Sequence, residues 1–78
     1  MTRAYILIQT EVGRAGSRVA DEIASLGGVV SAEDVTGPYD VVVQAEADSL
    51  DALNKDILAK IQGVPGITRT LTCPVVHL

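Results

Sequence analysis

The segment Val35-Thr36-Gly37-Pro38-Tyr39-Asp40-Val41 joins two strand-like runs near the middle of the 78-residue sequence. The first run, residues 29–35, ends at the first residue of this segment. The second run, residues 40–45, begins within it and contains three consecutive valines. β-Branched residues favour strands, whereas glycine and proline favour the turn between them. The segment therefore predicts two strands joined by a turn at the centre of the fold.

Outward from this turn, the sequence predicts two helices. Apolar residues recur at helical spacing over residues 17–26, and Gly27-Gly28 ends that segment because glycine accepts the left-handed backbone at a helix C-terminus. A longer helix follows a predicted N-cap at Asp48. The apolar stripe predicted for this second helix comprises Leu50, Leu53, Ile57, Leu58 and Ile61.

Two more β-rich segments, residues 4–10 and 67–76, lie near the ends of the chain. Pro74 cannot donate a ladder hydrogen bond, so the last strand is predicted at a sheet edge or at a bulge. The order β-α-β-β-α-β predicts the ferredoxin-like α+β class, a four-stranded antiparallel sheet with two helices on one face. The length of the chain predicts a single domain over residues 1–78.

The predicted strands are apolar on both faces. In the first strand, Tyr5 and Leu7 point to one side, and Ile6 and Ile8 point to the other. An antiparallel sheet with one solvated face should alternate apolar and polar residues. Because two helices cover only one face, we expect a second copy of the chain to cover the other. The alternative is a partly exposed face of ordinary β-forming residues.

The last strand carries two patterned sets of side chains. By alternation, its faces are Ile67, Leu71 and Val75 on one side and Thr68, Thr70 and Thr72 on the other. The threonines form either a ladder of cross-strand pairs or the hydroxyl-lined wall of a pocket. Arg69 falls opposite the threonines, and Cys73 is expected to be a small buried hydrophobe.

Composition argues against several functional classes. The net charge of -4 and the aromatic content of 3% disfavour nucleic-acid binding. One cysteine and one histidine, Cys73 and His77, cannot build a zinc site, and no triad-like grouping supports catalysis. We therefore expect no metal, no cofactor and no enzymatic activity. Without a long apolar run or a signal-peptide cleavage site, we expect no membrane span and a cytoplasmic location.

The segment around the turn resembles the effector-binding (RAM) domain of the Lrp/AsnC family of bacterial transcriptional regulators. The resemblance rests on Val35-Thr36-Gly37-Pro38-Tyr39-Asp40-Val41, on Gly63-Val64-Pro65-Gly66-Ile67, and on Thr68-Arg69-Thr70-Leu71-Thr72. The family typically shows a Thr-Gly-x-x-Asp turn at the first segment and Thr-x-Thr spacing at the last. The resemblance covers the whole chain, from the first predicted strand to Val76. The family's N-terminal helix-turn-helix is absent from this sequence, so it resembles a stand-alone form of the domain that does not bind DNA itself.

The resemblance implies a non-enzymatic sensor that binds an amino acid or a related metabolite at an oligomer interface. It implies a homodimer formed through the open sheet faces, and an octamer of four dimers as the larger assembly. The ligand-binding residues that it implies are Gly37, Tyr39 and Asp40, with hydroxyls from Thr70 and Thr72. Asp40 would either receive the ligand's ammonium group or fix the turn.

Three alternatives stay open. An ACT-like regulatory domain would bind its ligand near Gly13 and Gly16, between the first strand and the first helix. An oligomerisation partner of full-length Lrp/AsnC regulators would need no ligand of its own. A small dimeric ferredoxin-like enzyme would need a cluster of His, Trp or Asn side chains, and this sequence supplies almost none.

Overall fold

The computed structural model describes residues 1–11 and 17–76, and it has the predicted order of elements. The four strands are β1 (Thr2–Thr10), β2 (Val29–Asp34), β3 (Val41–Ala47) and β4 (Ile67–Pro74). The first helix is α1 (Ser17–Ala24). The second helix consists of three consecutive segments, namely α2 (Leu50–Ala52), the π-helical η1 (Leu53–Leu58) and α3 (Ala59–Gln62).

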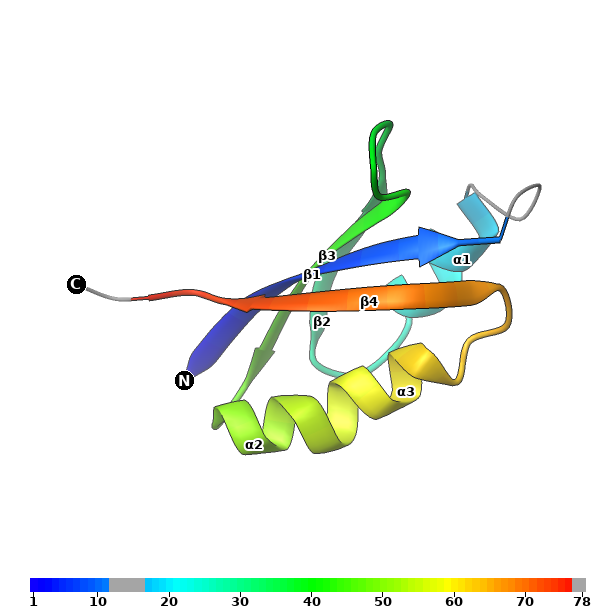
Figure 1. Ribbon diagram of the computed structural model, residues 1–78. Coiled ribbons are helices and arrows are strands. Elements are labelled where there is room, and N and C mark those ends of the chain that lie inside the picture. Colours follow the sequence, from blue (N-terminus) through cyan, green and yellow to red (C-terminus); the bar gives the residue numbers. More distant parts are fainter. Residues whose placement is uncertain (12–16, 77–78) are drawn as a thin grey trace.

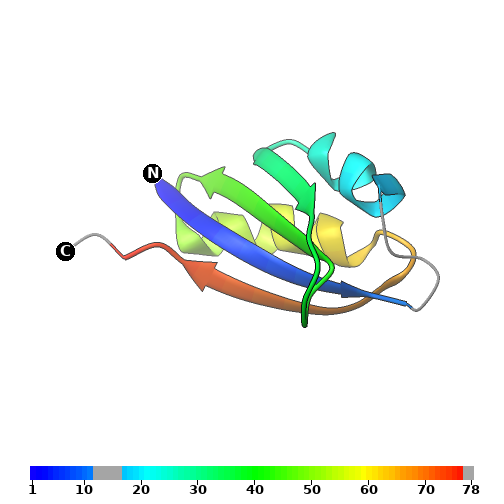
Figure 2. The same ribbon diagram turned by 90° about the horizontal axis from the view of Figure 1, so that it is seen from above.

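The strands form one antiparallel sheet in the order β2-β3-β1-β4. Both helices lie on the same face of this sheet (Figures 1 and 2). The register places Leu7 opposite Val42 on one side and opposite Leu71 on the other. The ferredoxin-like α+β prediction is therefore confirmed, and β4 with Pro74 lies at a sheet edge as predicted.

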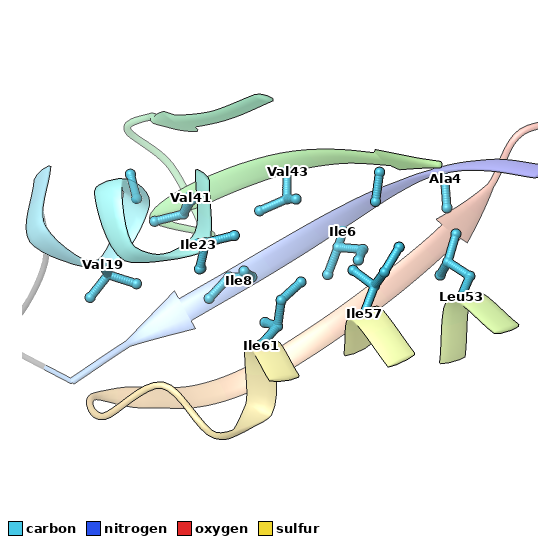
Figure 3. Packing of buried hydrophobic residues seen from close by; sticks show 12 residues of the cluster. Ala4, Ile6, Ile8, Val19, Ile23, Val41, Val43, Leu53, Ile57 and Ile61 are labelled. Atoms are coloured by element: carbon cyan, nitrogen blue, oxygen red, sulfur yellow. The ribbon is translucent and has the colours of Figure 1, made fainter. Parts of the chain in front are cut away.

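The core lies between the sheet and the two helices, as Figure 3 shows. The largest fully buried side chains are Ile6, Ile8, Ile23, Leu53, Ile61, Val41 and Val43. Each such side chain contributes about 1.5–3 kcal/mol when it leaves water. The burial of Ile6 and Ile8, with Tyr5 and Leu7 on the opposite face, agrees with the predicted alternation in β1.

The second helix differs from the prediction in its cap and its stripe. Ser49, and not Asp48, is the N-cap, because its Oγ accepts a 3.0 Å hydrogen bond from the Ala52 N–H. The wider turn of a π-helix favours alignment of residues four apart, and Leu53, Ile57 and Ile61 indeed face the core. This register leaves Leu50 43% exposed, so its assignment to the apolar stripe was wrong. No helix in the described part of the chain is long and apolar enough to cross a membrane.

A bulge in β4 changes which side chains of that strand lie on the same face of the sheet. Gln9 pairs with Arg69, but Thr10 pairs with Ile67, so Thr68 is an extra residue between the two pairs. The extra residue brings Ile67 to the helix side of the sheet, where it packs against the core, whereas Leu71 stays on the open face. Ile67 and Leu71 therefore do not share a face, because a bulge breaks the period-two alternation on which that prediction rested.

The loop between α1 and β2 is closely packed at Gly28. Gly28 has a φ of +89°, and a Cβ added there would lie 2.5 Å from Cδ1 of Ile57. The Gly28 carbonyl also accepts a 2.9 Å hydrogen bond from the Glu46 N–H. The predicted helix terminator thus also permits the close approach of this loop to η1 and β3.

Candidate functional site at the β2–β3 turn

The turn between β2 and β3 is closed by its own backbone. The Val35 N–H donates a 2.9 Å hydrogen bond to the Asp40 carbonyl, across the four residues between them. Gly37 adopts a φ of +145°, a conformation that L side chains rarely adopt, although a Cβ there would meet no atom within 4 Å. The backbone conformation, and not crowding, therefore requires glycine at this position.

Asp40 fastens the turn to the end of β1. Its Oδ2 accepts a 2.8 Å hydrogen bond from the Thr10 N–H and a 3.0 Å hydrogen bond from the Thr10 hydroxyl. The Asp40 N–H donates in turn to the Ile8 carbonyl at 2.8 Å. Within residues 1–11 and 17–76, the hydrogen bonds to this half-buried carboxylate all go to Oδ2, and Oδ1 accepts none.

The side chain of Gln9 also links the end of β1 to the turn. Its Nε2 donates a 2.7 Å hydrogen bond to the Pro38 carbonyl. The turn projects from the sheet away from the α2–α3 helix and crosses in front of the end of β1 in the view from above (Figures 1 and 2). Sequence reasoning missed the roles of Gln9 and Thr10. The only local signal is that two polar residues directly follow the apolar run of β1.

The predicted site residues fall into two groups. Gly37, Tyr39 and Asp40 lie together in the turn, where Tyr39 is half-buried. Thr70 and Thr72 lie on β4, opposite Ile8 and Ile6, and therefore on the helix side of the sheet. β1 separates β4 from β3. The structure of one chain thus brings together the three turn residues, but not the two threonines with them.

Thr70 belongs to a different hollow. Its hydroxyl accepts a 3.4 Å hydrogen bond from Nε2 of Gln62 in α3. A pocket of about 240 Å³ at this place is lined by Gln62, Ile67, Thr68, Arg69 and Thr70. Two pockets of about 310 and 350 Å³ lie at the opposite end of the sheet and share Gly28, Glu46, Ala47 and Asp48.

The remaining residues considered in the sequence analysis are either exposed or lie outside the described residues. Cys73 is exposed and pairs with Tyr5 on the open face, so its predicted burial was wrong. In the described residues, no three His, Cys, Asp or Glu side chains are grouped so that they could hold a metal ion. Gly13 and Gly16, on which the ACT-like alternative depends, and His77 lie outside the described residues.

The open face of the sheet carries an apolar row next to the turn. Val42, Leu7 and Leu71 stand side by side across β3, β1 and β4. Leu71 is 47% exposed and the neighbouring Tyr5 is 43% exposed. An Arg3–Glu46 ion pair at 3.2 Å lies at the far end of the same face.

Comparisons with known proteins identify a family and a fold. Residues 3–77 match the family model of the Lrp/AsnC ligand binding domain. An uncharacterised HTH-type transcriptional regulator of Pyrococcus furiosus is 27% identical over 73 residues, which cover 91% of this chain and 49% of the regulator. The chain thus spans about half the length of the curated relatives it matches.

Solved structures show the same fold. TTHA0845 from Thermus thermophilus superposes with a TM-score of 0.88 at 28% identity, covering 100% of this chain and 96% of that chain. AsnC of E. coli superposes with a TM-score of 0.86 at 26% identity, covering 99% of this chain and 52% of that chain.

Proposed function

The chain belongs to the Lrp/AsnC family of ligand-binding domains, and we propose that it binds an amino acid or a related small metabolite at the β2–β3 turn. The family is a regulatory part of transcription regulators and not an enzyme, in agreement with the sequence-based prediction. The observation that carries the proposal is the Thr36-Gly37-Pro38-Tyr39-Asp40 turn, which is hydrogen-bonded to β1 through Thr10 and Gln9.

The chemistry of the turn suits a small zwitterion. The Oδ1 atom of Asp40 is an acceptor for an ammonium group, and a hydrogen bond to a charged group is worth about 1.5–3 kcal/mol. Tyr39, the residue before it in the chain, is half-buried, and its ring offers an apolar surface with a polar tip. Thr70 and Thr72 join the site only through a further copy, because in one chain β1 lies between them and the turn.

The proposed assembly is a homodimer through the open sheet face, in the cytoplasm, with an octamer of four dimers as the larger form. The apolar row of Val42, Leu7 and Leu71 supports this part of the proposal. A second candidate function uses the same face: pairing with a full-length Lrp/AsnC regulator, without a ligand of its own. The exposure of Leu71 and Tyr5 supports pairing with a regulator as much as it supports a homodimer. The two functions differ in whether the chain binds a ligand.

A thermal-shift screen over glycine and the nineteen chiral L-amino acids tests the ligand. A compound that binds only the native state stabilises it by RT ln(1 + [L]/Kd), which is about 1.4 kcal/mol at a concentration about ten times the Kd. For a domain of this size, we expect the melting temperature to rise by about 5–10 °C with at least one amino acid.

The D-enantiomers at the same concentrations are the control for general solute effects. A rise seen with an L-amino acid but not with its D-form supports the site. If no amino acid raises the melting temperature, or if both forms raise it equally, amino-acid binding is excluded and the pairing function without a ligand takes its place.

A further inference from the structure

We propose that the end of the sheet opposite the β2–β3 turn holds a second ligand site, which takes a small primary amine with an apolar tail. The site is a hollow of about 350 Å³. Ligand pockets in proteins have volumes of about 300–1,000 Å³, with mostly apolar walls and a few polar groups that orient the ligand. This inference goes beyond the proposed function and does not depend on the turn.

Three segments that are distant in sequence meet around this hollow. They are the loop between α1 and β2, the end of β3 with the turn that follows it, and the second helix. The loop runs close beside that helix (Figure 1), and Gly28 permits the approach, because a Cβ there would lie 2.5 Å from Cδ1 of Ile57. The Glu46 N–H donates to the Gly28 carbonyl at 2.9 Å and so joins the loop to β3. The hollow is therefore formed within one chain.

Part of the lining is apolar and suits a hydrocarbon tail. Ala47, Ala52 and the buried Ile57 supply this surface. An adjoining hollow of about 310 Å³ shares Ala47 and adds Val29 and Val30. Val30 is 54% exposed, so a tail that covers it removes apolar surface from water. The two hollows together therefore have room for a tail of several carbon atoms.

The carboxylates of the hollow favour a cation. Three carboxylates belong to its lining, and one of them, on Glu46, already forms an ion pair with Arg3 at 3.2 Å. The other two, Asp48 and Asp56, take part in no ion pair within the described part of the chain. Because both side chains are short, their charges stay close to the hollow. The two aspartates therefore offer acceptors for an ammonium group.

Lys60 also lines the hollow but does not neutralise Asp56. The two residues are four apart on the second helix and form no ion pair, whereas Asp51 and Lys55, at the same spacing, pair at 3.3 Å. A lysine keeps its ammonium group in water while its stem lies along apolar surface. Lys60 is exposed, so its stem can line the hollow while the acceptors of Asp56 stay open to a ligand.

The helical wall of the hollow is irregular. Asp56 and Ile57 belong to the π-helical segment η1, and π-helical turns within α-helices are frequent at functional sites. A carboxylate and an apolar side chain, the two contacts that an amine with a tail needs, thus come from adjacent residues of this segment.

Amide NMR spectra with isoamylamine test the site. This compound has an ammonium group on a short branched alkyl chain. The signals of Gly27, Gly28, Ala47 and Asp48 should shift on titration, and those of residues 36–40 should not. Isoamyl alcohol has the same tail without the charge, and leucine adds a carboxylate that the two aspartates disfavour. Each should bind the hollow at least about tenfold more weakly than the amine.

Two variants remove one carboxylate each from the hollow. In Asp48→Asn and in Asp56→Asn, the dissociation constant of isoamylamine should rise about tenfold. Asp51→Asn is the matched control, because Asp51 is an exposed acid of the same helix that does not line the hollow. It should leave the affinity unchanged. Circular dichroism verifies that each variant is folded.

Several results would overturn the inference. Shifts confined to residues 36–40 would place the amine at the β2–β3 turn, which would remove the second site but support the proposed function. Equal binding of the amine and the alcohol would show that charge plays no part, and equal binding of leucine would show that the site does not select amines. Unchanged affinity in both Asp48→Asn and Asp56→Asn would remove the proposed acceptors.

Discussion

Replacing Leu71 with aspartate will convert the assembled protein into a folded monomer. Leu71 lies at the end of the apolar row on the open face and is 47% exposed in the single chain, so the monomer tolerates a charge there. In the proposed dimer the same carboxylate would be buried without a partner, at a cost of about 3–5 kcal/mol for each copy. Because the dimer holds two such carboxylates, we expect the dissociation constant to rise at least about ten-thousandfold, as measured by sedimentation velocity over a range of concentrations.

Leu50→Asp is the matched control for this variant. Leu50 is 43% exposed, almost the same as Leu71, but it lies in the first turn of the second helix and away from the open face. The control should assemble like the unmodified protein. If Leu71→Asp and Leu50→Asp have equal effects on assembly, the open face is not the interface.

Replacing Asp40 with alanine will destabilise the chain and abolish the candidate site. The change removes both hydrogen bonds from Thr10 and leaves a part-buried N–H without its acceptor. Hydrogen bonds to charged groups are worth about 1.5–3 kcal/mol, and we expect the free energy of unfolding to fall by that amount. Affinity for an amino acid should fall about tenfold to a hundredfold or more, if Oδ1 receives the ammonium group.

Two further variants separate the brace from the ligand contact. Asp40→Asn keeps an oxygen that accepts from Thr10 but removes the charge, so it should keep most of the stability and still lose affinity. Asp34→Ala removes an exposed carboxylate at the nearby end of β2 and should change stability by less than about 0.5 kcal/mol. Chemical denaturation and titration calorimetry give the two quantities. Unchanged stability in Asp40→Ala would show that the carboxylate does not brace the turn.

The order of the elements could be predicted because its signals are local. Three consecutive valines, a turn with glycine and proline, and Gly27-Gly28 each specify the backbone of a few residues. The predicted alternation of Tyr5 and Leu7 with Ile6 and Ile8 between the two faces of the sheet is likewise observed, because β1 is regular over these residues.

The errors arose where an irregularity breaks the period. The extra residue Thr68 reverses the side on which Ile67 lies, and the π-helical segment leaves Leu50 outside the core. A bulge or a wider helical turn is decided by the packing of the whole domain, and no single residue in the sequence marks either of them.

The candidate site could be predicted only in part for a related reason. The turn residues Gly37, Tyr39 and Asp40 are adjacent in sequence, so their proximity was certain once the turn was recognised. The contact between Asp40 and Thr10 joins residues thirty positions apart, and only the pairing of β1 with β3 brings them together. The separation of Thr70 from the turn depends equally on strand order, because β1 is inserted between β3 and β4.

The assembly of the unmodified protein is the most direct test of this account. The proposed homodimer requires a second copy to cover the open face of the sheet. Sedimentation velocity at micromolar concentration should give a dimer or a multiple of dimers. A single monodisperse species with the 8.1 kDa mass of one chain would contradict the account.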